Sequence, residues 1–258
     1  MKQGLLAMCA VVGLCACQSN LQTSSGQSYL DKYKNVPTVA AATTDGVSIE
    51  EQIRSVAAVE PVLQFPARIG IAKVGSRRIE PLSSEEAEAW FELAEKLGPA
   101  FGEFVPVSPL VAEMVSQSVS ANIATPINDV MNKIRLGAAR QHLDAVLIYE
   151  TYAKTENDSN FLSITELTII GAFILPSRAV EAIGYGNAIL IDVVQGYPYA
   201  TTDVTLEKEE ISSTRWNAGD RERELSETVR INAAIKLTKH VEDMMLQLRR
   251  DLHKARKE

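Results

Sequence analysis

The chain has 258 residues, of which 46% are apolar and 23% are charged. This composition suits a globular protein that buries a core, and the length fits one large domain with extensions. The formal net charge is −7. An acidic balance excludes nucleic-acid binding through a basic face, and it also excludes polybasic attraction to a membrane surface.

The N-terminus has the pattern of an export signal. Lys2 precedes an apolar run that extends from Gly4 to Ala16, and a bilayer-spanning helix needs ~20 residues, so this run is a signal peptide over residues 1–16. Residues 14–17 read Leu-Cys-Ala-Cys and resemble a lipobox. The resemblance implies diacylglyceryl transfer to Cys17, then cleavage between Ala16 and Cys17, and then N-acylation of Cys17, for example with palmitate.

The residues after Cys17 indicate the destination of the lipoprotein. Gln18 and Ser19 follow the cysteine, and the absence of an aspartate there favours the outer membrane, with the domain in the periplasm. Each buried CH₂ contributes ~0.8 kcal/mol, so several acyl chains on one residue anchor the protein permanently. Two alternatives stay open, namely an ordinary secretory signal that is cleaved elsewhere and an apolar N-terminus that is not cleaved.

Cysteine content limits the chemistry of the exported chain. The cysteines are Cys9, Cys15 and Cys17, so removal of residues 1–16 leaves Cys17 alone. An intrachain disulfide and a cysteine-based metal site are therefore excluded.

Residues 17–60 are predicted to form a lipid-anchored tether with a short helix, and residues 61–258 a periplasmic domain. The stretch 18–47 is rich in small polar residues, with local order expected around Tyr29. Ser48 and Glu51 form a capping-box pattern that begins a helix ending near Val59. A fully extended tether would reach on the order of 100 Å.

The first half of the domain alternates strands and helices. A strand is predicted at 67–74, and a capping box at 83–86 begins a helix that ends at Leu97, before Gly98. In the strand, Ile69, Ile71 and Lys73 share one face, and Gly70, Ala72 and Val74 share the other. A short strand at 104–107 is confined to a sheet edge by Pro106. Helices are predicted at 109–119 and 126–142.

The second half is predicted to contain mainly strands. Strands 144–154 and 161–175 are expected to form a hairpin around a turn at 157–160, and strands 188–194 and 199–207 follow a tight turn at 184–187. The last element is a long helix at 221–254 with one apolar stripe. Its wide apolar face favours packing on the domain's own sheet over a coiled coil with a partner.

This element order predicts the fold class. Helices and strands alternate at first and a run of strands follows, which indicates an α/β or α+β sandwich. Its mixed sheet would carry helices packed on it and a long C-terminal helix.

Two family resemblances are carried by short segments. The strand at 68–74, the pair Ala138-Ala139 before 143–148, and the segment 191–196 look like the periplasmic fold of curli-secretion (CsgG-like) and TolB N-terminal-like lipoproteins. That resemblance implies an architecture and carries no catalytic residues.

A further resemblance is to rhombotarget-type lipoproteins. It is carried by residues 28–30, 66–72 and 167–173. That family ends in a Gly-Gly sorting tail with a hydrophobic segment, whereas residues 251–258 are polar here. C-terminal processing is therefore not implied, and the resemblance assigns no activity.

Candidate catalytic and metal-binding residues are sparse. The histidines are His142, His240 and His253, and the last two are 13 residues apart on the predicted C-terminal helix, which gives no metal pair. The sequence contains no nucleophile elbow and no phosphate-binding loop. No catalytic residue, metal or cofactor is therefore predicted.

Two other features have alternative interpretations. Glu150 and Glu166 would face each other across the predicted hairpin as an acid/base pair, or Glu150 would face solvent or pair with Lys154. Residues 167–175 are almost continuously apolar, which favours a buried strand over an alternating membrane-spanning one.

These observations predict a non-catalytic protein-binding or assembly module of the cell envelope. The alternative is an oligomeric secretion accessory of the curli-secretion type, and an envelope enzyme ranks third. The expected partners are the membrane, through the lipid anchor, and an envelope protein or a second copy of the chain. A binding module should expose an apolar patch or a free strand edge, whereas an enzyme should show a pocket with convergent polar groups.

Overall fold

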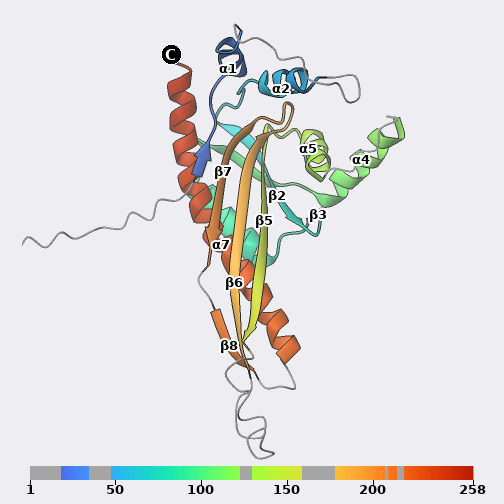
Figure 1. The fold of residues 1–258 in the computed structure, drawn as a ribbon, viewed down its shortest axis with the longest axis vertical. Helices are drawn as coiled ribbons and strands as arrows, with labels where there is room; N and C mark the ends of the chain where they lie inside the picture. The colour runs from blue at the N-terminus through green and yellow to red at the C-terminus, as the bar shows by residue number, and fades with distance from the viewer. Residues whose placement is uncertain are drawn as a thin grey trace, which may run out of the picture.

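A computed structural model describes residues 19–34, 48–122, 130–158, 178–206, 209–213 and 218–257. Figure 1 shows a twisted sheet with helices on both faces and the long helix α7 along its length. Cys17, the predicted signal peptide 1–16, the predicted strand 161–175 and Glu166 lie outside the described residues.

The elements have the following bounds. The strands are β1 (Ser19–Leu21), β2 (Ala67–Gly75), β3 (Arg78–Glu80), β4 (Gly102–Pro106), β5 (Ala145–Asp158), β6 (Arg178–Asp192), β7 (Pro198–Thr205) and β8 (Glu209–Ser213). The helices are α1 (Gly26–Asp31), α2 (Ile49–Ala57), α3 (Ser84–Leu97), α4 (Pro109–Asn122), α5 (Val130–Arg140) and α7 (Ala218–Ala255).

The described strands form one mixed sheet with the order β1-β7-β6-β5-β2-β3, while β4 pairs with β2 and β8 with β6. Strand β2 runs parallel to β4 and β5. The pairs β5–β6, β6–β7, β6–β8, β1–β7 and β2–β3 are antiparallel. The predicted α/β class is confirmed, with a mixed sheet, packed helices and a long C-terminal helix.

One face of the sheet is covered by α7 and α3. Ile69 and Ile71 from β2 and Leu147 from β5 meet Trp90 from α3 and Met244 from α7 in a single buried cluster. The stripe predicted for the last helix therefore packs on the domain's own sheet, as the wide apolar face indicates.

The opposite face is covered in part by α5. Ala72 and Val146 of the sheet contact Ile134 and Ala138 of α5 in a second buried cluster. The two sides of β2 thus point into different clusters, which confirms the predicted alternation. Helix α4 lies against α5, where a Cβ at Gly137 would be 2.7 Å from the Cβ of Ala112, so only glycine allows this close approach.

The local helix signals are confirmed. Ser48 and Ser83 each accept a hydrogen bond in a complete capping box, at the N-termini of α2 and α3. Helix α3 ends at Gly98 with a φ of 69°, a backbone conformation that glycine adopts without steric cost.

The turn predicted at 157–160 is corrected in part by the structure. Strand β5 includes Asn157 and Asp158, and its antiparallel partner among the described strands is β6, while residues 161–175 lie outside the described residues. The tight turn predicted at 184–187 is wrong as well, since these residues lie inside β6. A Cβ at Gly184 would be 2.7 Å from Cγ1 of Val229. The glycine therefore serves the close approach of α7 to the strand rather than a turn.

The stretch predicted as tether contains part of the sheet. Strand β1 pairs with β7, with Ser19 opposite Thr202 and Leu21 opposite Ala200. The backbone N–H of Gln22 extends this contact by donating to the carbonyl of Tyr199 at 2.8 Å. The sheet therefore begins well before residue 61, and α1 falls where local order is expected around Tyr29.

A buried ion pair joins β2 to α3. Lys73 Nζ lies 2.8 Å from Glu86 Oε2, with side-chain exposures of 6% and 0%. The same carboxylate oxygen accepts from the backbone N–H of Ser83 at 3.0 Å. The capping box and the ion pair thus share one group, which fixes the N-terminus of α3 over the sheet.

We expect Lys73→Met to lower the free energy of unfolding by about 3–5 kcal/mol, because Glu86 would remain buried without its cation. The double variant Lys73→Met, Glu86→Gln removes both charges, and glutamine is accepted at this position of a capping box. It should recover much of the loss in urea titrations monitored by circular dichroism. A single variant that is no less stable than the double variant would contradict this account.

Candidate functional site

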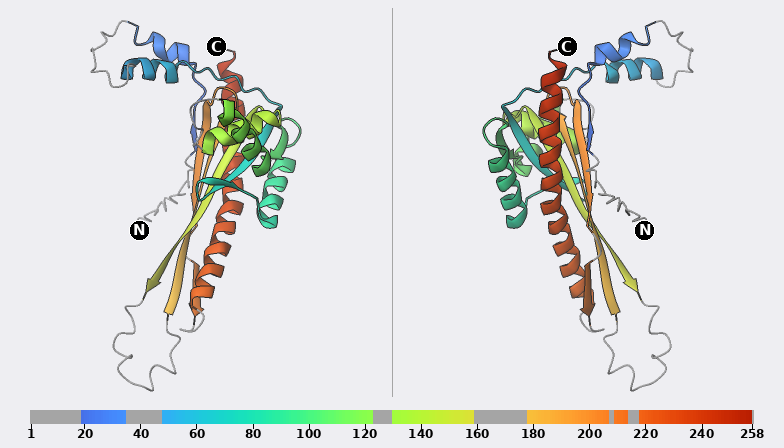
Figure 2. Two further views of the ribbon diagram at one scale, coloured as in Figure 1. Left: turned by 90° about the vertical axis from the view of Figure 1, so that its right-hand side faces the viewer. Right: turned by 90° about the vertical axis from the view of Figure 1, so that its left-hand side faces the viewer.

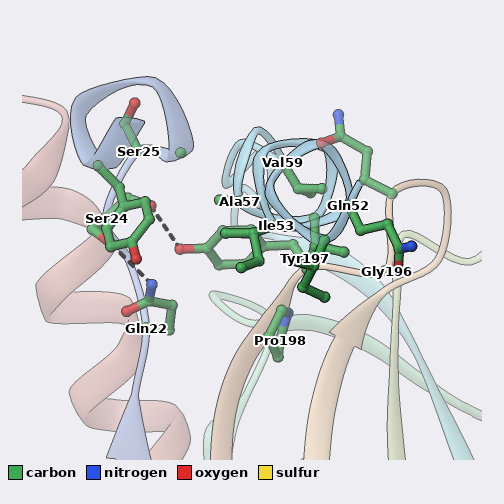
Figure 3. A pocket seen from close by; sticks show the side chains of 15 residues that line it. Gln22, Ser24, Ser25, Gln52, Ile53, Ala57, Val59, Gly196, Tyr197 and Pro198 are labelled. Carbon is green, nitrogen blue, oxygen red and sulfur yellow. Dashed lines mark hydrogen bonds between the residues drawn. The ribbon is translucent and has the colours of Figure 1, made fainter. Parts of the chain in front are cut away.

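A groove of about 690 Å³ opens between α1, α2 and the turn that joins β6 to β7. Figure 3 shows Ile53, Ala57 and Val59 on one side of it and Tyr197 and Pro198 below. All of its lining residues are uncharged. The groove therefore suits an apolar ligand more than a charged one.

Helix α2 supplies the most exposed apolar side chains of the groove. None of its residues is buried, and Ile49, Ile53 and Val56 are 53%, 52% and 77% exposed. Their spacing of four and three residues places them on one side of the helix. An amphipathic helix whose apolar side is left open by the described part of its domain indicates a contact surface.

Two tyrosines of the β6–β7 region hold the N-terminal segment to the sheet. The hydroxyl of Tyr197 donates to the carbonyl of Ser24 at 2.8 Å (Figure 3), and burial raises the pKa of Tyr197 to about 12. The hydroxyl of Tyr199 accepts from the backbone N–H groups of Val62 and Leu63 at 2.9 and 2.7 Å, and burial raises its pKa as well. Both rings therefore remain neutral hydrogen-bonding groups at physiological pH.

Glu60 connects α1 to the rest of the domain. Its carboxylate oxygen Oε1 accepts from Ser25 Oγ at 2.9 Å and from the backbone N–H of Gln27 at 2.7 Å. The backbone N–H of Glu60 donates to Gln195 Oε1 at 3.3 Å. A Cβ on Gly26 would collide with the carbonyl oxygen of Ala57, so α1 and α2 touch at the backbone.

A second surface is the long β5–β6 arm, which projects below α3, α4 and α5 (Figures 1 and 2). Strand β2 pairs with β5 only as far as Glu150. Beyond it, residues 151–158 pair with β6 alone among the described strands. Tyr152 and Tyr185 stack on this arm with ring centroids 4.9 Å apart, and Tyr152 is 47% exposed.

The structure separates the histidines that the sequence analysis considered. His142 follows α5 with a φ of 57°, and its carbonyl accepts from Arg68 Nη1 at 3.2 Å. His240 on α7 makes a 2.8 Å hydrogen bond through Nδ1 with the carbonyl of Asp203, and His253 lies near the end of the same helix. No cluster of three or more His, Cys, Asp or Glu residues that could hold a metal is found among the described residues.

The proposed carboxylate pair is only half described. Glu150 Oε1 accepts from Asn187 Nδ2 at 3.3 Å, and Asn187 lies opposite it on β6. Glu166 and Cys17, the predicted lipidation site, lie outside the described residues. The structure therefore gives Glu150 a polar cross-strand partner and does not test the acid/base interpretation.

The groove was not predicted from the sequence. The apolar residues that α2 contributes to it do follow a helical spacing of i, i+4, i+7 in the sequence, at Ile49, Ile53 and Val56. The other side comes from residues near 24 and 197, which are far apart in the chain.

None of the described helices combines the length and apolar character needed to cross a bilayer.

Comparison with protein families and with curated proteins finds no match for this chain. Three solved structures show weak similarity. The LpoB C-terminal domain from Salmonella enterica is 15% identical over 55% of this chain and 83% of its own, with a TM-score of 0.26. The PelC dodecamer from Paraburkholderia phytofirmans is 13% identical over 70% and 92%, with a TM-score of 0.31. Lipoprotein GNA1162 from Neisseria meningitidis is 17% identical over 64% and 96%, with a TM-score of 0.27. GNA1162 is thus described as a lipoprotein and PelC as a dodecamer. Sequence identities and TM-scores this low assign no activity, partner or assembly to the present chain.

We expect Gly26→Ala to separate α1 from α2 and open the groove, because the new methyl group meets backbone rather than a movable side chain. Overpacking of this kind costs about 1–3 kcal/mol. Amide hydrogen exchange should accelerate in α1 and α2 and stay unchanged in β5. Ser28→Ala on the exposed side of α1 is the matched control, and equal exchange in the two variants would contradict the contact.

Proposed function

We propose that this chain is an outer-membrane lipoprotein, anchored through Cys17, whose periplasmic domain is a non-catalytic module that binds an envelope protein. The observation that carries the binding role is the edge of β5 beyond Glu150, where residues 151–158 pair with β6 alone among the described strands. Such an edge presents backbone N–H and C=O groups in a row, and an extended segment of a partner can pair with it as an added strand.

The edge of β7, which lies near the groove, is covered by other parts of the chain. On β7, the carbonyls of Asp203 and Thr205 are bonded to His240 Nδ1 and to Lys236 Nζ from α7, at 2.8 and 2.9 Å. Strand β1 covers the neighbouring part of β7. Side chains and a short strand thus close that edge, and the contrast supports a binding role for the β5 edge.

The stacked tyrosines add side-chain recognition to the backbone edge. Tyr152 lies on β5 itself and Tyr185 directly opposite it on β6. Exposed aromatic rings bury large areas at little entropic cost and are frequent anchors at protein interfaces. We therefore assign the edge to an extended apolar or aromatic segment of an envelope protein.

The described part of the arm suits water rather than a bilayer. Helix α7 runs along it, with Leu225 and Val229 packed on Ala182. The same turns of α7 carry Glu222, Arg223, Glu224 and Glu227, whose transfer into lipid would be costly. These charges favour a binding arm over a membrane-inserted one.

A second candidate function is an oligomeric export accessory, and it uses the same arm. The arm has two outer strands among the described residues, β5 on one side and β8 on the other, each paired with β6. Pairing of β5 with β8 of a second copy would be a head-to-tail contact, which closes into a ring when the rotation permits.

The anchor is tested by expressing the full-length chain and Cys17→Ala in a Gram-negative host. Wild type should fractionate with the outer membrane and require detergent for release. The variant should be found as a soluble or unprocessed protein, because it cannot receive the acyl chains. Unchanged membrane location and processing of the variant would refute lipidation at Cys17.

The binding edge is tested by replacing Tyr152 with the photo-crosslinking residue p-benzoylphenylalanine in the anchored protein. Phe91, which is 65% exposed on α3, receives the same residue as the control because it is also an exposed aromatic. We expect adducts from position 152 only, identified by mass spectrometry as one envelope protein. Adducts with a second copy of the chain favour the export accessory instead, and equal yields at both positions exclude the edge as a binding site.

A further inference from the structure

We infer that α1 and α2 dock on the bilayer that holds Cys17, with Tyr29, Ile49, Ile53 and Val56 in contact with lipid. The domain then lies against the membrane rather than at the end of a long tether. This inference rests on the proposed lipidation of Cys17 and adds to it a second, non-covalent contact with the same membrane.

Few residues separate Cys17 from the sheet. Strand β1 begins at Ser19, two residues after Cys17, and each residue spans at most ~3.3–3.6 Å. The acylated residue therefore lies within roughly 7 Å of the sheet edge. Because the register of β1 on β7 is defined by three residue pairs, the anchor position is tied to the body of the domain.

Cys17 is also close in the chain to residues that line the groove. The chain runs from β1 directly into Gln22, Ser24 and Ser25, all of which line the groove. Ser24 is seven residues from Cys17, so no more than about 25 Å of chain separates them. A bilayer that contains the acyl chains of Cys17 is thus within reach of α1 and α2.

Exposed apolar side chains are concentrated in the N-terminal part of the described chain. Among the described residues, thirteen large apolar side chains are exposed. Six of them fall between residues 29 and 62, namely Tyr29, Tyr33, Ile49, Ile53, Val56 and Val62. Almost half of the exposed large apolar side chains thus lie in the segment that directly follows the anchor.

Helix α2 has the character of an interfacial helix. Its apolar side chains Ile49, Ile53 and Val56 accompany Glu50, Glu51 and Arg54 in a single short helix. A helix with separate apolar and charged sides and low overall hydrophobicity lies in the plane of a membrane interface. It is too short and too polar to cross the bilayer, so contact with the interface is the geometry that fits.

Helix α1 and the turn after it add groups that suit the headgroup region. The rings of Tyr29 and Tyr33 are in contact, with centroids 5.2 Å apart, and are 43% and 46% exposed. Tyrosine is enriched at membrane interfaces because its ring is apolar and its hydroxyl is polar. Lys34 lies beside them and pairs with Asp31 at 2.6 Å, and Lys32 leaves this turn with a net positive charge.

The covalent anchor favours lipid over a protein as the occupant. The acyl chains hold the membrane near the groove at high effective concentration, so a modest apolar contact suffices as the second attachment. The uncharged lining offers no ionic selectivity for a protein. Figure 2 shows α1 and α2 standing out from the sheet on the side away from α7, where a flat surface reaches them without meeting that helix.

The experiment uses full-length lipoprotein reconstituted in phosphatidylethanolamine–phosphatidylglycerol vesicles. Ile53→Cys is labelled with an environment-sensitive nitrobenzoxadiazole dye, and its thiol is the free one because Cys17 is acylated. Phe91→Cys on α3 is the matched control. We expect blue-shifted emission and several-fold lower accessibility to an aqueous quencher at position 53 in vesicles, with no change at position 91.

The outcomes separate the inference from the anchor itself. Protein that floats with vesicles, but whose label at position 53 stays as accessible as in a soluble Ile53→Cys variant that lacks residues 1–17, overturns the docking and leaves lipidation intact. Protein that does not float refutes both. A blue shift that appears without vesicles and grows with protein concentration assigns the surface to a second copy and also overturns the docking.

A second variant guards against an effect of the label. Ile49→Glu, in the Val56→Cys labelled background, places a charge on the same side of α2. It should restore quencher accessibility at position 56 while the protein still floats. Unchanged accessibility would show that this side of the helix does not contact lipid.

Discussion

The pairing of β1 with β7 is the constraint on which the N-terminal part of the structure depends. Three residues, Ser19 to Leu21, add a strand to the sheet edge, and Tyr197 and Tyr199 then bond the segments that follow. The strand leads the chain to α1, where the hydrogen bonds of Glu60 and the backbone contact of Gly26 with Ala57 hold that helix beside α2 and complete the groove. A segment with the composition of a tether thus becomes part of the domain through backbone hydrogen bonds.

Helix α7 determines where binding surfaces can be. It lies along one face of the sheet from the arm to the C-terminus (Figure 2), and its buried residues extend from Leu225 to Leu252. Its side chains also close the edge of β7 at Asp203 and Thr205. Among the described residues, the edge of β5 beyond Glu150 and the groove beside β1 are two surfaces that α7 leaves uncovered.

The sequence predicted those elements whose signal comes from residues close together in the chain. The capping boxes at Ser48 and Ser83 and the alternation in β2 depend on neighbours within four residues, so the sequence shows them directly. Gly184 carries a signal that fits both a turn and a close approach, and only the tertiary contact with Val229 decides between them. The groove could not be predicted, because its walls lie more than a hundred residues apart in the chain.

The two proposed contacts reinforce each other physically. A long flexible tether would let the β5 edge sample a large volume, and each encounter with a partner would have to restrict that motion. The proposed anchor two residues before β1, together with the proposed lipid contact through α2, would restrict the domain before any partner arrives. Because orientational freedom is reduced in advance, a short strand edge with Tyr152 beside it can bind an envelope protein with a smaller entropic cost than the same edge on a free chain.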